Sequence, residues 1–205
     1  MSGKKLSELG ITEDLVPQIM AVKEVVFPFD RFPGTDVLLG PEMKSTGEVI
    51  ALADEFPMAF AKAQVAAGMV LPQSGTVFVS VRDKDKAAAV KVAGKLHELG
   101  FKIMATRGTA QALQEQGVPA NLVNKVTEGR PHIVDRILSG DVQLVINTTV
   151  GSQSIKDSKS LREAGLRQDV PYVTTISAAR AIASAIEACG GQNFDLPPSL
   201  QTLHS

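Results

Sequence analysis

From residue 76 to residue 190, short apolar runs alternate with longer segments in which apolar residues recur at helical spacing. The apolar runs predict strands at residues 76–81, 101–105, 121–126, 142–146 and 170–174. Each strand is followed by a predicted helix, at residues 84–99, 109–116, 131–138, 155–164 and 177–188, and every helix but the third ends at a glycine. Strands and helices that alternate in this way form parallel sheets. The pattern therefore predicts an α/β fold with a five-stranded parallel, Rossmann-like sheet flanked by helices.

The first 72 residues have a less regular pattern. It predicts short strands at residues 21–27 and 48–52, a Pro- and Gly-rich passage between them, and a helix over residues 57–68. So few elements cannot bury both faces of a sheet, which indicates a part of a larger structure. We therefore divide the chain into an incomplete α+β unit (1–72), an α/β domain (73–190) and a loose tail (191–205).

Composition excludes several classes of function. The net charge of −1 and the absence of tryptophan argue against a nucleic-acid partner, and no apolar run is long enough to span a membrane. Cys189 is the only cysteine and the three histidines are widely separated, so neither an internal disulfide nor a metal site is expected. Cys189 lies among small residues and is predicted to be buried. The N-terminus does not resemble a signal peptide, and we expect a cytoplasmic location.

The segment FKIMATRGT, residues 101–109, is the first candidate for a binding site. A predicted strand ends there, and Thr106, Arg107, Gly108 and Thr109 lead into a helix. Hydroxyls, a cation and a glycine at a helix N-terminus suit an anion, because free N–H groups and the helix dipole both favour negative charge. The ordinary alternative is that Thr109 only caps the helix and Gly108 only makes the turn. The segment alone favours neither interpretation.

Polar residues follow the other predicted strands as well. The carboxyl ends of parallel strands meet at one edge of a sheet, where open α/β sheets bind ligands. The candidates at this edge are Lys86, Thr106, Gly108, Thr109, Lys125, Asn147, Thr148 and Thr149. Each has an ordinary alternative, since a lysine is usually solvated and Asn147 could cap a turn. Taken together, cations, hydroxyls and one amide suit a phosphate that carries a sugar or a base.

The same edge lacks the groups that catalysis would need. We expect its acidic residues to be limited to Glu128, Asp135 and Asp157, with no convincing acid–base pair. Asp135 is expected to face solvent or to pair with a neighbouring arginine. Neither a G-x-x-x-x-G-K-[ST] loop nor a G-x-G-x-x-G turn follows the first strand of the α/β domain. The edge is therefore predicted to bind a ligand without a catalytic residue.

Several runs of the chain resemble the large chain of the carbamoyl phosphate synthetase family. VKEVVFPFDRFPGTDVLLGPEMKSTGEV (22–49) resembles the closing segment of its second ATP-grasp unit. SVRDKDK (80–86), ATRGTA (105–110), LVNKVTEGRPHIVDRI (122–137) and INTT (146–149) resemble its C-terminal domain. The resemblance covers roughly residues 1–185. It implies a methylglyoxal-synthase-like fold for the α/β domain, preceded by an incomplete ATP-grasp remnant.

The resemblance also implies a place in carbamoyl phosphate synthesis for the pyrimidine and arginine pathways. In that family the large chain makes carbamoyl phosphate from bicarbonate, ammonia and ATP, with Mg or Mn, and a small glutamine amidotransferase chain supplies the ammonia. The ATP- and metal-binding residues would precede residue 1, so no cofactor is expected in this chain itself. The implied partners are a nucleotide monophosphate, the remainder of the large chain and the small chain, with a homo-oligomer as a further one.

In the family, the C-terminal domain is regulatory and binds nucleotide monophosphates such as UMP or IMP. By resemblance, Lys86 and Lys125 would supply cations to the phosphate, and the ATRGTA run would surround it with Thr106, Gly108 and Thr109. The residues of the INTT run would face the nucleotide: Asn147, Thr148 and Thr149. Some members also bind ornithine, and the matching residues here are Glu24, Tyr172 and Thr174. The other ornithine carboxylates of the family would lie upstream of this chain.

Three alternatives to a regulatory nucleotide site remain open. A free-standing lyase of the methylglyoxal synthase type would need a catalytic aspartate, but Arg130 stands at its place in the EGRPH turn. A guanidinium cannot act as a general base at neutral pH. The related cyclohydrolase domain of purine synthesis shares the fold, but residues 22–49 have no counterpart there. The domain could also serve mainly in oligomer contacts.

Overall fold

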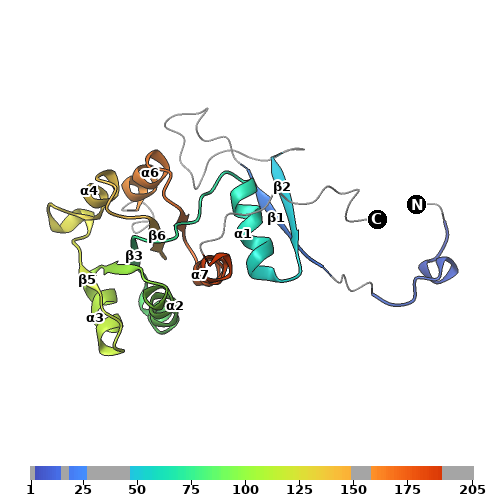
Figure 1. The fold of residues 1–205 in the computed structure, drawn as a ribbon, viewed down its shortest axis with the longest axis horizontal. Coiled ribbons are helices and arrows are strands. Elements are labelled where there is room, and N and C mark those ends of the chain that lie inside the picture. The colour runs from blue at the N-terminus through green and yellow to red at the C-terminus, as the bar shows by residue number, and fades with distance from the viewer. Residues whose placement is uncertain (1–2, 15–18, 27–46, 149–157, 191–205) are drawn as a thin grey trace.

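The computed structural model describes residues 3–14, 19–26, 47–148 and 158–190 (Figure 1). Its main part is a five-stranded sheet with the strand order β5-β4-β3-β6-β7, in which all neighbours are parallel. The strands are β3 (Thr76–Ser80), β4 (Lys102–Ala105), β5 (Asn121–Leu122), β6 (Leu144–Asn147) and β7 (Tyr172–Val173). The predicted α/β fold with a five-stranded parallel sheet is thus confirmed.

The strand order reverses next to β3. The chain runs outward from β3 through β4 to β5, then returns to the other side of β3 and continues through β6 to β7. The connections that leave β3 and β6 therefore diverge to opposite sides of the sheet. In open α/β sheets, such a switch point leaves a crevice beyond the carboxyl ends of the strands.

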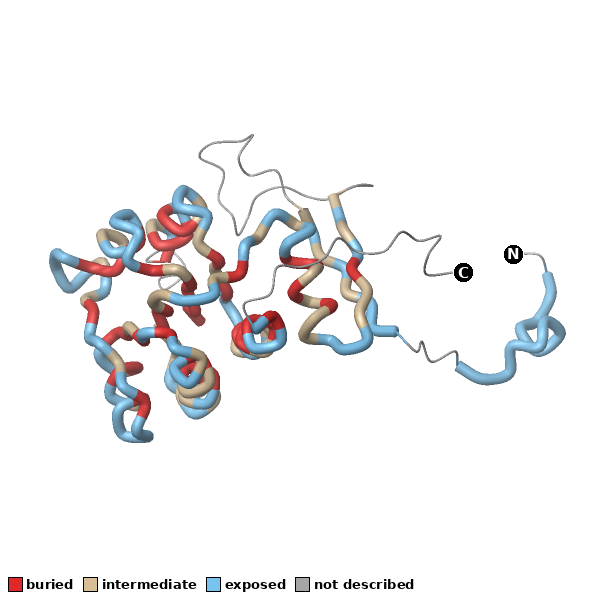
Figure 2. The backbone as a smooth tube through the Cα atoms, in the orientation of Figure 1, coloured by how far each residue is buried: buried red, intermediate tan, exposed pale blue. Residues whose placement is uncertain are grey.

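Helices cover both faces of the sheet. On one face lie α2 (Lys86–Glu98), α3 (Arg107–Glu115) and α7 (Ile176–Cys189), and on the other lie α4 (Ile133–Leu138) and α6 (Lys159–Arg167). Successive residues of β3 point to alternate faces, so Val77 and Val79 join the first core and Phe78 joins the second. Figure 2 shows the resulting concentration of buried residues in the strands. A strand buried on both faces explains the continuous apolar run in the sequence.

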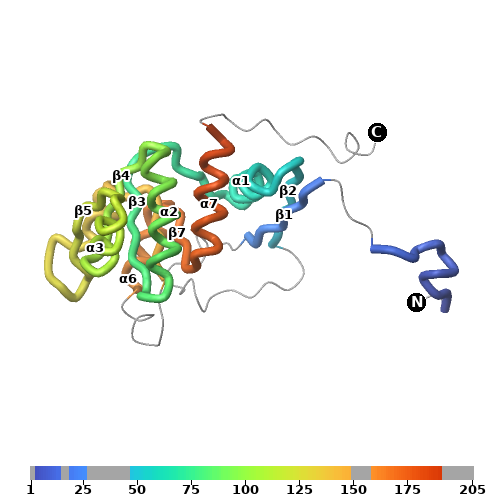
Figure 3. Tube along the Cα trace, turned by 90° about the horizontal axis from the view of Figure 1, so that it is seen from below, coloured from blue at the N-terminus to red at the C-terminus, as the bar shows by residue number. Residues whose placement is uncertain are grey.

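A smaller unit precedes the sheet. Its strands β1 (Met20–Val25) and β2 (Glu48–Ala53) pair antiparallel, and α1 (Phe56–Ala66) packs against both. The same helix packs against α7, which lies between α1 and α2 in Figure 3. Alanines at positions 59, 61 and 63 of α1 are fully buried, and such small side chains allow close packing of helices and strands. Farther toward the N-terminus, a 3₁₀ helix spans Leu6–Leu9 with no buried residue.

Several observed bounds correct the predicted ones. Helix α3 begins at Arg107 and not at residue 109, because the extended backbone of Thr106 directly precedes the first turn. The predicted strand at residues 121–126 is wrong in its second half: β5 pairs with β4 over two residues only, and a 3₁₀ helix follows at Val126–Glu128. Gly165 does not end its helix but lies inside α6, where an added Cβ would come within 3.6 Å of the Tyr172 ring.

Other predictions fall on single residues or on parts of the chain that the structure does not describe. Cys189 is fully buried in α7, as predicted, and this burial raises the pKa of its thiol. Residues 28–46 of the Pro- and Gly-rich passage, Thr149, Asp157 and the tail at residues 191–205 lie outside the described residues.

Substitutions at two neighbouring residues of α4 test how this helix packs against the sheet. Ile137 is fully buried in the core beneath α4 and α6, whereas the next residue, Leu138, is 43% exposed. We expect Ile137→Ala to lower the free energy of unfolding by about 2–5 kcal/mol, because it removes buried methyl groups and leaves a cavity. Leu138→Ala is the matched control and should change it by about 0.5 kcal/mol or less. Urea unfolding followed by circular dichroism measures both. Equal effects of the two substitutions would contradict the described packing of α4.

Candidate functional site

A pocket of about 260 Å³ opens at the carboxyl ends of β3, β4 and β6, beside the switch point of the sheet. Apolar side chains, Phe78, Ile133 and Leu161, line part of its wall. The other lining residues are Ser80, Val81, Arg82, Thr106, Lys125, Val126, Thr127, Asn147, Thr148 and Ser158. Four of the predicted site residues thus line one pocket: Thr106, Lys125, Asn147 and Thr148. Gly108, Thr109 and Lys86 do not line it, and they lie around the start of α3.

The N-terminus of α3 adjoins this pocket. The carbonyl oxygen of Thr106 accepts from the amides of Thr109 and Ala110, at 2.9 and 2.8 Å. The Thr106 hydroxyl does not cap the helix and instead lies 3.2 Å from Ser80 Oγ. No acceptor for the amides of Arg107 and Gly108 is found within the described ranges. Two N–H groups at the positive end of the helix dipole are therefore available to an anion.

Thr109 connects the segment after β4 to the residue that follows β3 through a hydrogen bond. It is the third residue of α3, not its cap, and its hydroxyl accepts from the Val81 amide at 3.2 Å. The Thr106 hydroxyl lies 3.5 Å from the same oxygen. Thr109 is almost completely buried. Its position supports a role in holding the loop after β3 against α3.

Lys86 is the first residue of α2, and its ammonium group lies above the start of α3. A Cβ added to Gly108 would lie 3.4 Å from Lys86 Nζ, which shows how close the two approach. Lys86 Nζ also pairs with Asp83 Oδ1 at 2.8 Å. That hydrogen bond, with the charge of Lys86, lowers the pKa of Asp83. Since the Asp83 side chain is 95% exposed, this pair is a surface pair that an incoming anion could replace.

A carboxylate that the sequence analysis missed lies beside the pocket. Asp85 accepts from Arg82 Nε, and its side chain is only 14% exposed. The Arg82 amide donates to Thr148 Oγ1 at 3.2 Å, and the Thr148 amide donates to the Ser80 carbonyl oxygen at 3.0 Å. Burial alone would raise the pKa of Asp85, but hydrogen bonds from Arg82 and Thr148 outweigh it and lower the pKa. The spacing of three residues between Arg82 and Asp85 was the available sequence signal.

Lys125 reaches the pocket from the turn after β5. Lys125 is among the residues that line the pocket, and its amide donates to Glu128 Oε2 at 2.9 Å. Arg130 does not line the pocket: its side chain is 81% exposed, and its Nε lies 3.8 Å from Asp135 Oδ1. The pairing of Asp135 with a neighbouring arginine is thus confirmed, although Asp135 also accepts from the His132 amide at 2.9 Å.

A buried polar cluster holds Asn147 at the end of β6. Its Nδ2 donates to Ser158 Oγ at 3.0 Å and to Tyr172 Oη at 2.6 Å. Burial raises the pKa of Tyr172, against hydrogen bonds from Asn147, Ser158 and Arg162 and against the charge of Arg162. Arg162 and Ser158 are themselves buried, and the sequence analysis singled out neither of them. Only their placement on the turn and helix after β6 could have suggested them, because no motif contains them.

The residues predicted for ornithine lie in different surroundings. Tyr172 packs on the sheet face covered by α4 and α6, whereas α1, which carries the partner of Glu24, packs against α7 on the opposite side. Glu24 Oε2 accepts from Gln64 Nε2 at 2.7 Å. Thr174 is exposed just after β7. No hydrogen bond or ion pair joins Glu24 to either residue in the described part of the chain, and the ornithine role stays a prediction.

Comparison with known proteins identifies the region around this pocket. An MGS-like domain matches residues 88–174. The carbamoyl phosphate synthase large chain of Myxococcus xanthus is 52% identical over 97% of this chain and 18% of its own length. The large chains of Rhizobium meliloti and of a Nostoc species are 58% and 48% identical, over 87% and 96% of this chain. The chain is homologous to the C-terminal region of these large chains.

The match covers only a small part of each relative. The chain spans 15–18% of the length of the three large chains named above. Among solved structures, the crystal structure of ForH aligns with a TM-score of 0.46 and 18% identity, over 58% of this chain and 82% of that one. That likeness is too distant to bear on function. The family resemblance noted in the sequence is confirmed by the large-chain matches.

Two other classes of feature are a membrane-spanning helix and a metal site. No helix among them combines the length and apolar character needed to cross a membrane. Within the same residues, no group of three or more His, Cys, Asp or Glu side chains could hold a metal ion.

The lowered pKa of Asp85 predicts that the free energy of unfolding depends on pH. Its folded-state pKa lies below the ordinary value of 3.8, so the ionised carboxylate stabilises the fold above that value. This contribution is lost as the pH falls through the lowered pKa. We expect Asp85→Asn to be less stable than the unaltered chain at pH 7, with a difference that shrinks in acid. Urea unfolding from pH 7 down to below pH 3.8 measures this difference in the free energy of unfolding.

Asp141→Asn is the control for this comparison, because Asp141 forms a more exposed pair with Arg136. It should have the smaller effect at pH 7. If Asp85→Asn stays less stable than the unaltered chain by the same amount down to strong acid, the charge of the carboxylate is not the cause of its lower stability.

Proposed function

We propose that this chain is the regulatory region of a carbamoyl phosphate synthase large chain and binds a nucleotide monophosphate of the UMP or IMP type. The observations that carry the proposal are two free amides at the start of α3 beside the pocket, the Lys86 ammonium group close to them, and Lys125 among the residues that line the pocket. Free amides and cations are the groups that bind a phosphate. The apolar wall of the pocket suits the ribose and base.

In the proposed site, the phosphate would replace Asp83 as the ion-pair partner of Lys86. Lys86 already has an exposed carboxylate partner in Asp83, so its ammonium group is held near α3 before the ligand binds. Replacing this surface pair costs little, because exposed ion pairs contribute about 0–1 kcal/mol. The phosphate would gain two charges and the helix dipole in its place.

The pocket is poorly suited to proton abstraction. The carboxylate beside it, Asp85, has a lowered pKa and is bound by Arg82, which makes it a weak base. Arg130 does not line the pocket, and its guanidinium cannot accept a proton. These features support a binding role over the alternative of a methylglyoxal-forming lyase.

The wider role follows from the relatives and forms part of the same proposal. The chain would act together with the remainder of a large chain and a glutamine amidotransferase small chain. Its ligand would control carbamoyl phosphate synthesis for the pyrimidine and arginine pathways in the cytoplasm. That synthesis would use ATP with Mg or Mn bound outside this chain. The relatives described above are themselves large chains of carbamoyl phosphate synthase.

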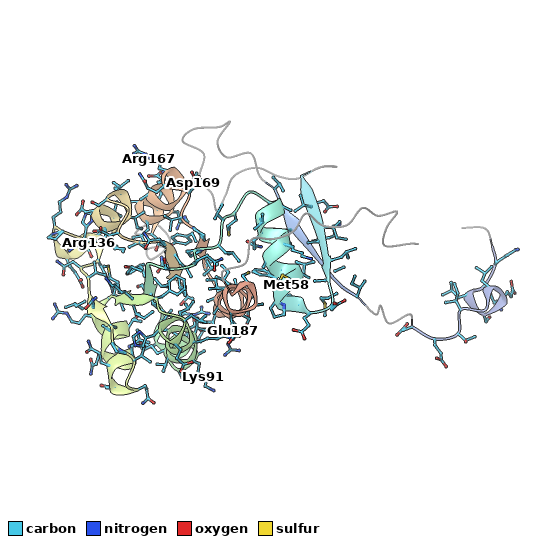
Figure 4. The ribbon with its side chains drawn as sticks, viewed as in Figure 1. Met58, Lys91, Arg136, Arg167, Asp169 and Glu187 are labelled. Atoms are coloured by element: carbon cyan, nitrogen blue, oxygen red, sulfur yellow. The ribbon has the colours of Figure 1, made fainter. Side chains whose placement is uncertain are left out.

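Titration with UMP and with IMP tests the proposed function. We expect one of them to bind the chain at up to millimolar concentration in isothermal titration calorimetry. Lys86→Glu should weaken that binding by about 10-fold or more, because it replaces a phosphate-binding cation by a repelling charge. Lys91→Glu makes the same charge change on α2 and is the control, since Lys91 is exposed and points away from the sheet in Figure 4. Absence of binding by both nucleotides, or equal loss in the two variants, would refute the site.

A second measurement separates binding from lyase chemistry. We expect the chain to form no methylglyoxal from dihydroxyacetone phosphate, because no suitable base lies at the pocket within the described residues. A colorimetric assay for methylglyoxal checks this, with a methylglyoxal synthase as the positive control. Enzyme-dependent formation of the product would favour the lyase alternative.

A further inference from the structure

A second pocket lies on the face of the sheet that carries α4 and α6. Its volume is about 530 Å³, and it shares no lining residue with the pocket at the carboxyl edge. In Figure 1, α3 lies on one side of β5 and α4 on the other. Met104 is only partly buried on the face of α4, and Asn121 is exposed, so the helices leave this end of the face open. A pocket of this volume can hold a small molecule.

Strand register builds the floor of this second pocket. Thr76 is the register partner of Lys102, and Met104 is that of Asn121. Ile103 belongs to the core on the opposite face, so Lys102 and Met104, at the alternate positions of β4, lie on the face of the pocket. The pairing thus places an ammonium group, a hydroxyl, an amide and a thioether side by side.

Two cations and one carboxylate line the second pocket: Lys102, Arg136 and Asp141. Arg136 Nη1 donates to Asp141 Oδ2 at 3.1 Å, and both side chains are nearly half exposed. A guanidinium has five N–H donors, and this one has no other side-chain partner among the described residues. Within the same residues, no ion-pair partner is found for Lys102. The pocket therefore has one net positive charge and unused donors.

The geometry points to a second small-molecule site, for a monocarboxylate that carries an apolar body. A carboxylate accepts parallel hydrogen bonds from a guanidinium such as that of Arg136, and the ammonium group of Lys102 adds a second charge-assisted donor. The single net positive charge suits a monoanion better than a phosphate dianion. Met104, Val123 and Pro131 line the same pocket and provide the apolar surface for the body of the ligand. This site does not depend on the nucleotide proposal.

One segment of the chain borders both pockets. Residues 121–124 line the second pocket, and residues 125–127 line the pocket at the carboxyl edge. Between these two stretches, the Asn124 carbonyl oxygen accepts from the Ile133 amide at 3.1 Å, which ties the segment to the start of α4. The pockets differ in chemistry, because the free amides that suit a phosphate lie at the start of α3, whereas the second pocket offers side-chain cations beside apolar residues. A ligand in the second pocket would contact the segment that carries Lys125.

Two-dimensional ¹H–¹⁵N NMR of the 205-residue chain tests this site with three probes. The probes are benzoate, benzamide, which keeps the ring but lacks the charge, and inorganic phosphate, which lacks the apolar body. We expect benzoate at millimolar concentration to shift the amide signals of Lys102 and of residues 121–124. Benzamide should bind about 5-fold more weakly or not at all, because it forms no charge-assisted hydrogen bonds to Lys102 and Arg136. Phosphate should leave these signals unshifted.

Two variants and a matched control accompany the titration. Lys102→Met and Arg136→Gln each remove one charge from an exposed residue and should weaken benzoate binding about 5- to 10-fold. Lys91→Met removes a charge from exposed α2 surface and should change it by less than about twofold. The proposal is wrong if benzoate shifts no signal, if benzamide binds equally well, or if the shifts are confined to residues 106–109 and 125–127. It is also wrong if sedimentation shows a dimer of the chain in which benzoate leaves the signals of the second pocket unshifted.

Discussion

Parallel pairing of β3 with both β4 and β6 is the constraint on which the rest of the structure depends. It brings three strand ends to one edge, and each end carries a hydroxyl or an amide: Ser80, Thr106 and Asn147. None of these residues is near another in sequence. Because β3 lies in the middle with helices on both faces, small shifts of the site would require movement of two buried cores. The edge is therefore rigid where the proposed ligand would lie.

Helix α7 joins the sheet to the preceding unit. One side of it contributes Ile182, Ile186 and other apolar residues to the core of the sheet, and it also packs against α1. Lys95 of α2 pairs with Glu187 of the same helix. Any change at the pocket that moves β7 would thus have a short route through α7 to the unit that contains β1 and β2. The large chain of Myxococcus xanthus is several times longer than this chain.

The sequence predicted the fold and most of the edge, but not the polar cluster behind it. Alternating apolar runs identified all five strands, since a strand buried on both faces must be apolar throughout. Thr106, Lys125, Asn147 and Thr148 were predicted because they lie at or just after the ends of predicted strands. Ser158 and Arg162 were missed because their neighbours belong to other elements, so only tertiary packing brings them together. Asp85 was missed although its partner Arg82 lies only three residues before it. The start of α3 was placed two residues late, since Thr106 does not use its hydroxyl as a cap.

The position of Tyr172 also has an optical consequence. The chain contains this one tyrosine and no tryptophan, so its near-ultraviolet absorbance beyond the phenylalanine bands comes from a single side chain. That chromophore hydrogen-bonds directly to Asn147 at the edge of the pocket. The unmodified protein therefore carries its own spectroscopic reporter, next to the site, without an introduced label.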